Sequence, residues 1–331
     1  MTKAMAMVVE GPNVRGVALA SLAPDLDLAR AFAVESKAPR TRDAYRYQWA
    51  TFVAWCEERD LDALPADPAT LAGYLANRAE LGWKVASIAL ALTAISAAHK
   101  AAGVVSPSAH PIVAATWAGI RRTLGTAQRR AAPATVEAVR AMVQALGIEG
   151  APSPARMRDR ALVLIGFAGA FRRSELEALD VSDLSFRAEG LVVAVRRSKT
   201  DQEGAGAEVA IAYGNDAATC PVRALRSWLD AACLRDGPAF RTVDRHGHIG
   251  GRLVGAEVAR IVKRLATRAG LDASRFSGHS LRAGLATSAA VQGRADRRIM
   301  DQGRWKSRAM VDRYVRDASL FRDNVSAGIG L

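Results

Sequence analysis

The chain has 331 residues, half of them apolar, which exceeds one typical domain, fits two and suffices to bury substantial cores. Lys and Arg outnumber Asp and Glu by 46 to 33, so a polyanion is the first partner to consider, although a solvated basic surface explains the excess equally well. No apolar run approaches the roughly 18 to 20 residues of a membrane span, which excludes a transmembrane protein of the helical class.

The cysteines and the N-terminal residues indicate the cellular compartment in which the protein is expected. Cys56, Cys220 and Cys233 are odd in number and unpatterned, which argues against a disulfide framework or a zinc site and for a reducing compartment. Residues 1–24 carry one weak apolar run broken by charge, glycine and proline, which makes a poor signal peptide. We therefore expect a loosely ordered lead-in to a cytoplasmic protein.

Residues 25–126 have the pattern of a helical bundle. From residue 41 onward, apolar residues such as Tyr45 and Trp49 fall at helical spacing. Asp67 and Pro68 form an N-cap and first-turn pair for a second helix, and two more are expected over residues 85–102 and from residue 111 onward. This part is large enough to hold its own core.

Basic residues recur at the ends and outer faces of these helices. Cations near helix C-termini can simply offset the helix dipole. Together with the second part of the chain, described next, five of them become candidates for phosphate contacts: Arg42, Arg46, Lys84, Arg121 and Arg122.

Residues 127–134 lack apolar periodicity and contain a proline, so we place a linker there and a second domain over residues 135–331. An apolar helix is predicted at about 155–170, directly before Arg172 and Glu175. These two side chains could form an ordinary surface ion pair at i and i+3. The end of a long apolar helix instead predicts that Arg172 lies at the rim of the core.

Two β-type runs, residues 191–195 and 208–212, flank a basic and polar turn that holds Lys199. The pattern predicts a hairpin with Lys199 near its tip, either simply solvated or able to reach into a groove. Helices are expected at about 221–234 and 255–269, with a turn-rich stretch between them. His246 and His248 lie in that stretch among glycines, without acidic or thiol ligands nearby, which disfavours a metal site.

The stretch 278–314 collects groups that suit phosphate chemistry. His279 and Arg282, at i and i+3, project from the same side of a helix and could address one anion. Trp305 and Tyr314 are nine residues apart, so a continuous helix would set them on different faces. We therefore expect a turn at 306–307.

Four pieces occur in order: Arg172 with Glu175, Lys199 in a hairpin, His279 with Arg282, and Trp305 followed by Tyr314. Each piece is weak alone, but the ordered set resembles the tyrosine recombinase (phage integrase) family over residues 25–325. Most members have a second histidine where Trp305 stands, and tryptophan at this position resembles the Cre-like branch.

The resemblance implies a mainly α-helical protein. A helical core-binding (SAM-like) bundle would span residues 25–126. Residues 135–331 would form a mixed α/β, mostly helical catalytic domain with a small antiparallel sheet and a C-terminal tail helix. It also implies cleavage and rejoining of double-stranded DNA at a site with inverted repeats, by a tetramer joined through the tail at residues 318–325, without ATP, cofactor or required metal. The short apolar face of this tail could instead pack onto its own domain.

The catalytic set that the resemblance implies is Arg172, Lys199, His279, Arg282, Trp305 and Tyr314, with Glu175 in support. Tyr314 would attack the scissile phosphate and leave a 3′-phosphotyrosyl link and a free 5′-hydroxyl. Arginine suits the non-bridging oxygens because its planar fork donates two hydrogen bonds. Lys199 would protonate the leaving oxygen, His279 would assist deprotonation of the tyrosine, and Trp305 could donate its indole N–H but cannot exchange protons.

Two other functions stay open at this point. A type IB topoisomerase shares the phosphotyrosine chemistry but relaxes supercoils as a monomer, and the helical first domain and Cre-like features argue against it. A non-catalytic DNA-binding regulator could use the same scaffold, but every expected catalytic position is filled. The DNA site and the biological outcome, such as phage integration, resolution or cassette movement, do not follow from the sequence.

Overall fold

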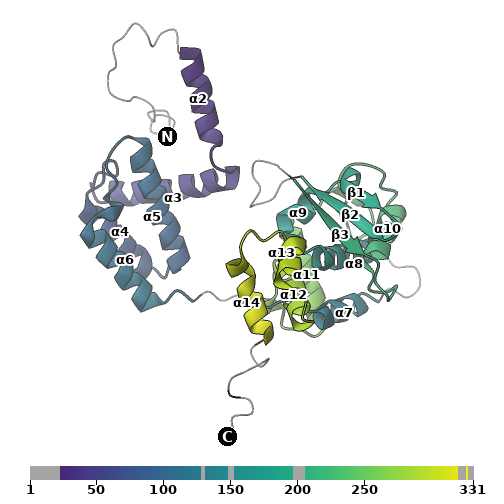
Figure 1. The fold of residues 1–331 in the computed structure, drawn as a ribbon. Coiled ribbons are helices and arrows are strands. Elements are labelled where there is room, and N and C mark those ends of the chain that lie inside the picture. The colour runs from purple at the N-terminus through teal and green to yellow at the C-terminus, as the bar shows by residue number, and fades with distance from the viewer. Residues whose placement is uncertain (1–22, 128–130, 148–152, 197–205, 320–325, 327–331) are drawn as a thin grey trace. The chain divides into compact units, whose positions relative to one another are not determined.

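The computed structural model describes residues 23–127, 131–147, 153–196, 206–319 and 326, and it divides the chain into two compact units (Figure 1). The N-terminal unit comprises residues 1–128 and the C-terminal unit residues 129–331. The boundary lies within the predicted linker of residues 127–134. No helix in the described ranges is long and apolar enough to cross a membrane.

The N-terminal unit is built from helices. They are α2 (Ala23–Glu35), α3 (Pro39–Glu57), α4 (Pro68–Glu80), α5 (Val85–Ala101) and α6 (Pro111–Leu124). The predicted cap at Asp67 is confirmed, since its Oδ1 accepts the backbone N–H of Ala69 at 2.7 Å. Two boundaries differ from the prediction: α3 begins two residues before residue 41, and α2 begins at Ala23, inside the expected lead-in of residues 1–24.

Aromatic side chains hold the core of the N-terminal unit. The ring of Tyr74 meets Phe52 edge-on at 4.9 Å and Trp55 at 5.4 Å between centroids. His99 is fully buried and satisfied, because its Nε2 accepts the backbone N–H of Ala66 and its Nδ1 lies 2.9 Å from the carbonyl oxygen of Ile95. Burial raises the pKa of the nearby Cys56 thiol to about 11, so this thiol stays protonated at neutral pH.

The C-terminal unit combines helices with small antiparallel sheets, as predicted. Its helices are α7 (Val136–Gln144), α8 (Pro154–Ala168), α9 (Arg173–Ala178), α10 (Pro221–Ala231), α11 (Gly255–Arg268), α12 (Ser280–Val291), α13 (Asp296–Gly303) and α14 (Arg308–Ser319). Its strands are β1 (Leu184–Phe186), β2 (Gly190–Val195), β3 (Ala207–Ala212), β4 (Arg241–Val243) and β5 (Ile249–Arg252).

The predicted hairpin supplies β2, the central strand, and β3, an edge strand, of a three-stranded sheet of order β1-β2-β3. Leu191 pairs with Ile211 and Val193 with Val209, which directs all four side chains into the core. Strand β1 and the β4–β5 hairpin were not predicted, and the region of His246 and His248 that we expected to be only turns connects β4 to β5.

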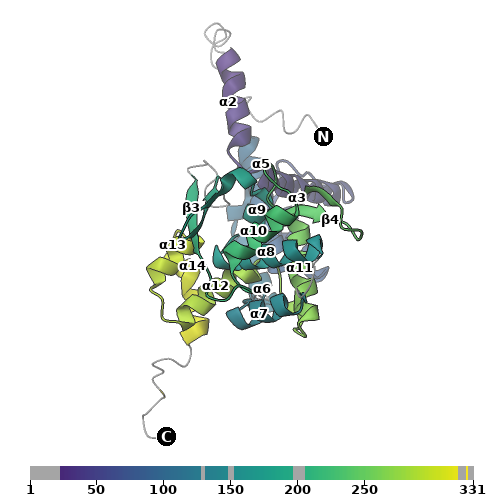
Figure 2. The same ribbon diagram turned by 90° about the vertical axis from the view of Figure 1, so that its right-hand side faces the viewer.

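Helices α12, α13 and α14 gather at one side of the C-terminal unit in both views (Figure 1, Figure 2). A small apolar cluster that includes Ile299, Trp305 and Val311 holds them together. Helix α12 also lies very close to the start of the unit, because a Cβ added at Gly284 would come within 1.8 Å of the carbonyl oxygen of Ala134. These contacts fix the helices that carry the predicted site.

Candidate active site

Arg172 and Glu175 form a buried pair at the start of α9. The Nη1 atom of Arg172 lies 2.6 Å from Oε1 of Glu175, and the backbone N–H of Arg172 donates to Oε2 at 2.8 Å. The side chains are 13% and 1% exposed. The alternative of an ordinary surface ion pair is therefore wrong, and Arg172 does lie at the rim of the core.

Arg282 is buried in α12 beside this pair. Its Nη1 donates to the carbonyl oxygen of Ala170 at 2.5 Å, and its guanidinium lies over the Trp305 ring at 4.1 Å. Its Nη2 atom is buried and has no hydrogen-bond acceptor among the described residues. Burial, and then the nearby charge of Arg172, lower the pKa of Arg282 to about 9, so the fold holds this positive charge at a cost in free energy.

A third guanidinium, that of Arg304, completes the cluster and was not singled out in the sequence. Its Nη2 lies 2.7 Å from Oε2 of Glu175, and its Nη1 donates to the carbonyl oxygens of Gly169 at 3.2 Å and Gln302 at 3.0 Å. Its guanidinium also lies 5.1 Å from the centroid of the Phe171 ring. The only hint in the sequence is its place directly before Trp305.

The charge of Glu175 depends on these arginines. Burial alone raises the pKa of Glu175, but the charge of Arg304 and the hydrogen bonds from Arg172 outweigh burial and leave the pKa below its usual value. The carboxylate is therefore ionised at neutral pH. Three guanidinium groups around one carboxylate leave a surplus of positive charge, which a phosphodiester anion would offset.

The histidine and the tyrosine meet in the folded chain. Nε2 of His279 lies 3.1 Å from the hydroxyl oxygen of Tyr314, although the two residues are 35 positions apart. The Trp305 and Tyr314 rings lie 5.9 Å apart at 51°. The predicted break between these aromatics is confirmed, because α13 ends at Gly303 and α14 begins at Arg308.

Glycine permits the close packing of this turn. A Cβ at Gly303 would fall 1.8 Å from the ring of Trp305. Since real Cβ contacts essentially never fall below 3.0 Å, any larger residue at this position would displace the indole. The indole links the two halves of the site, because it packs against both Arg282 and Tyr314.

Lys199 lies outside the described residues, so its position is not given. The strand end that leads to it is anchored, because Nη2 of Arg196 contacts Oδ2 of Asp180 at 2.6 Å and Oδ2 of Asp183 at 2.9 Å.

In the stretch that we considered for a metal site from the sequence, His248 pairs with Asp244 at 2.9 Å. In the described part of the chain no three His, Cys, Asp or Glu residues form a group that could hold a metal ion.

The five basic candidates of the N-terminal unit lie on its helices or at their ends. Arg42 and Arg46 in α3 form ion pairs with Glu35 at 2.6 Å and with Asp43 at 3.1 Å. Lys84 precedes α5 and is exposed, and so are Arg121 and Arg122 in the last turn of α6. All five lie in the N-terminal unit, whereas the catalytic cluster lies in the C-terminal unit.

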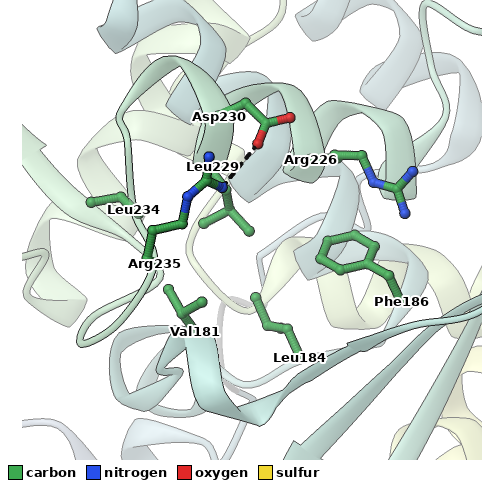
Figure 3. A pocket seen from close by; sticks show the side chains of 8 residues that line it. All are labelled: Val181, Leu184, Phe186, Arg226, Leu229, Asp230, Leu234 and Arg235. Carbon is green, nitrogen blue, oxygen red and sulfur yellow. Dashed lines mark hydrogen bonds and ion pairs between the residues drawn. The ribbon is translucent and has the colours of Figure 1, made fainter.

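A cavity of about 260 Å³ lies between β1 and α10 and shares no residue with the catalytic cluster (Figure 3). Its lining includes apolar residues such as Leu184 and Leu229, and also the pair between Arg235 and Asp230. The side chain of Arg226 covers the Phe186 ring at 4.7 Å. The chemistry-bearing side chains thus gather elsewhere, around α9, α12 and the turn between α13 and α14.

Known proteins resemble this chain in sequence. It is 40% identical over 294 residues to the integrase/recombinase xerD homolog of Selenomonas ruminantium, which covers 88% of this chain and 85% of that protein. It is 25% identical over 289 residues to the recombinase cre of Escherichia phage P1, with 81% of each covered. The second match agrees with the predicted Cre-like features.

Solved structures share the fold. The Tn1549 transposon integrase, in complex with transposon right end DNA, matches with a TM-score of 0.62 at 12% identity and covers 88% of this chain and 95% of that one. The lambda integrase (residues 75–356) bound to DNA matches with a TM-score of 0.57 at 19% identity, covering 90% and 96%. The phage integrase family model matches residues 134–320, more than half of the chain. The chain therefore belongs to the phage integrase family and is a tyrosine site-specific recombinase.

Proposed function

We propose that this recombinase cleaves and rejoins DNA through a 3′-phosphotyrosyl intermediate on Tyr314. One observation carries the proposal: the Tyr314 hydroxyl lies 3.1 Å from Nε2 of His279, next to a cluster in which Nη2 of Arg282 is buried without an acceptor among the described residues. A nucleophile, a base and an unused donor for an anionic oxygen are thus linked by direct contacts through Trp305.

In the proposed step the Tyr314 oxygen forms a bond to the scissile phosphorus, and the bond from phosphorus to the 5′-oxygen breaks. His279 takes the hydroxyl proton through Nε2, which requires the tautomer that carries its proton on Nδ1. Lys199 supplies the proton for the leaving 5′-oxygen. Because the phosphotyrosyl link conserves the energy of the phosphodiester, attack by a 5′-hydroxyl reverses the step without ATP, a cofactor or a required metal.

The arginines stabilise the charge that develops on the phosphate. Arg172 and Arg282 bind the non-bridging oxygens, and Glu175 fixes the orientation of Arg172. Trp305 packs the tyrosine segment and offers its indole N–H to a phosphate oxygen. It takes no part in proton transfer, which leaves His279 and Lys199 as the proton-transfer groups.

Double-stranded DNA with inverted repeats is the proposed partner. One related structure is described as a lambda integrase dimer bound to a COC′ core site and another as a lambda integrase tetramer bound to a Holliday junction. By analogy we propose a tetramer joined through the tail at residues 318–325, a DNA-binding domain over residues 25–126 and a cytoplasmic location. Residues 320–325 of this tail lie outside the described part of the chain. Phosphate contacts are assigned to Arg42, Arg46, Lys84, Arg121 and Arg122.

A nicked suicide duplex tests the chemistry. The DNA sequence is first selected from a random library by binding to the wild-type protein, and the duplex is nicked so that a short 5′-hydroxyl strand diffuses away after cleavage. Wild-type protein is expected to accumulate a covalent adduct at the 3′-phosphate, and Tyr314→Phe is expected to form none. Absence of the adduct with wild type, or an undiminished adduct with Tyr314→Phe, contradicts the proposal.

A further inference from the structure

Arg304 adopts a backbone conformation that residues with a side chain rarely adopt. It is the C-cap of α13 with φ of 56° and ψ of 45°, in the left-handed region where glycine is usual. The preceding Gly303 is the last residue of α13, and a Cβ at this position would overlap the Trp305 ring. The chain thus places an arginine where glycine would fit with less strain, which points to a task for the side chain.

The Arg304 guanidinium reaches inward rather than to solvent. Its side chain is 10% exposed and its partner carboxylate, that of Glu175, is 1% exposed. It contacts the carbonyl oxygens of Gly169 and, at 3.4 Å, of Ala170, which lie in the connection between α8 and α9. One side chain therefore links the end of α8, the first turn of α9 and the turn between α13 and α14.

Two neighbours of Arg304, Glu175 and Ala170, also bind an arginine proposed to hold the phosphate. Glu175 shares its carboxylate, with Oε2 toward Arg304 and Oε1 toward Nη1 of Arg172. The carbonyl oxygen of Ala170 accepts from both Arg304 and Nη1 of Arg282. Movement of the Arg304 guanidinium would therefore disturb both phosphate ligands at once.

We propose that Arg304 is a positioning residue, which orients Arg172 through Glu175 and Arg282 through Ala170, and does not itself bind DNA. The proposal rests on the proposed function, because it assigns Arg304 to the same phosphate site. Loss of this side chain lowers the rate of the chemical step and leaves DNA affinity nearly unchanged.

The test uses full-length protein and the nicked duplex of selected sequence described above. Arg304→Gly removes the side chain and suits the left-handed backbone. It is expected to bind the duplex within about twofold of wild type and to form the adduct ~10 to 100-fold more slowly, as for loss of an orienting side chain. Cys233→Gly is the matched control, since Cys233 is exposed and has a φ of 51° in the same unit; its adduct rate stays at the wild-type value.

Chemical rescue separates a positioning role from a general packing role. Guanidinium at low millimolar concentration fills the site vacated in Arg304→Gly and raises its adduct rate several-fold, whereas urea at the same concentration does not. Arg304→Lys keeps the charge but cannot bind Glu175 and both carbonyls together, so its rate falls between those of Arg304→Gly and wild type.

The failures are distinguishable. If wild type forms no adduct, the proposed function fails. If wild type reacts and Arg304→Gly reacts at the same rate, Arg304 has no positioning role. A loss of DNA affinity that equals the loss of rate would mean that Arg304 binds DNA directly and would overturn the proposal. If Arg304→Gly does not fold, Arg304→Lys carries the test, and a wild-type rate for it contradicts the inference.

Discussion

Among the described residues of the C-terminal unit, Asp159 and Glu175 are buried carboxylates with two arginine partners each, and they are satisfied differently. Asp159 binds Nε and Nη2 of Arg158 at 2.9 and 2.7 Å and Nη2 of Arg264 at 2.5 Å. The remaining Nη1 of Arg158 donates to the carbonyl oxygen of Arg241. Every guanidinium nitrogen of the buried Arg158 thus has a partner within the protein.

The Glu175 cluster leaves donors unused. Glu175 faces Arg172 and Arg304, and Arg282 lies beside them with a buried Nη2 that has no acceptor among the described residues. A buried donor without a partner costs stability, and so does a surplus of like charge. The comparison indicates that the Asp159 cluster serves the fold and that the Glu175 cluster retains binding capacity for an anion.

The largest expected effect tests this difference in chemistry. Arg282→Lys keeps the charge but loses the planar fork, so adduct formation on the nicked duplex should fall by ~10²- to 10³-fold. Arg158→Lys is the matched control and should react within about threefold of wild type at a temperature where it is folded. The measurement is single-turnover adduct formation. Equal losses in the two variants would remove the distinction between the clusters.

For the free energy of unfolding, substitution of Arg158 should have a larger effect than substitution of Arg282. Arg158→Met leaves Asp159 buried without its principal partner, which should lower the free energy of unfolding by about 3–5 kcal/mol. Arg282→Met removes a buried charge that lies among other cations and should cost much less, or even stabilise the unit. Urea unfolding of both variants measures the difference, and a larger loss for Arg282→Met would contradict the comparison.

The sequence predicts the Glu175 cluster only in part. Arg172, Glu175 and Arg282 could be identified because spacing along short helical segments and order along the chain are visible in the sequence. Arg304 could not, since an arginine after glycine at a helix end resembles a solvated C-terminal residue. Its inward direction follows from contacts with Gly169, Ala170 and Glu175, which lie 129 to 135 positions earlier in the chain.

The fold could be predicted from the sequence where a periodic apolar pattern extends over a whole helix or strand. The apolar spacing of the helices and the alternating β2 and β3 runs reflect burial on one face, which is visible locally. Strands β4 and β5 are short, and β5 contains Gly250 and Gly251, so neither has a strand-like pattern. Their pairing depends on tertiary contacts, as does the contact of His279 with Tyr314 across 35 residues.

The contribution of Arg282 to the free energy of unfolding should depend on pH, and this effect is smaller. Burial, and then the charge of Arg172, lower the pKa of Arg282 from its usual value to about 9. Between these values the unfolded chain binds more protons than the folded chain, so this group makes the free energy of unfolding rise as pH rises. The free energy of unfolding of wild type minus that of Arg282→Met, measured by urea unfolding, should therefore be larger at about pH 10 than at about pH 8. If this difference in stability did not change with pH, the pKa of Arg282 would not be lowered in the folded protein.

Arg264, the more exposed of the two arginine partners of Asp159, gives the smallest predicted change in stability. Arg264 has a side chain that is 50% exposed, and Asp159 keeps its two bonds from Arg158 without it. Arg264→Gln should therefore cost only ~0.5 to 1 kcal/mol in urea unfolding and leave the adduct rate unchanged. Arg304→Gln, at a side chain that is 10% exposed, should slow adduct formation. If Arg264→Gln slowed the adduct as much as Arg304→Gln, the Asp159 cluster would also belong to the active site.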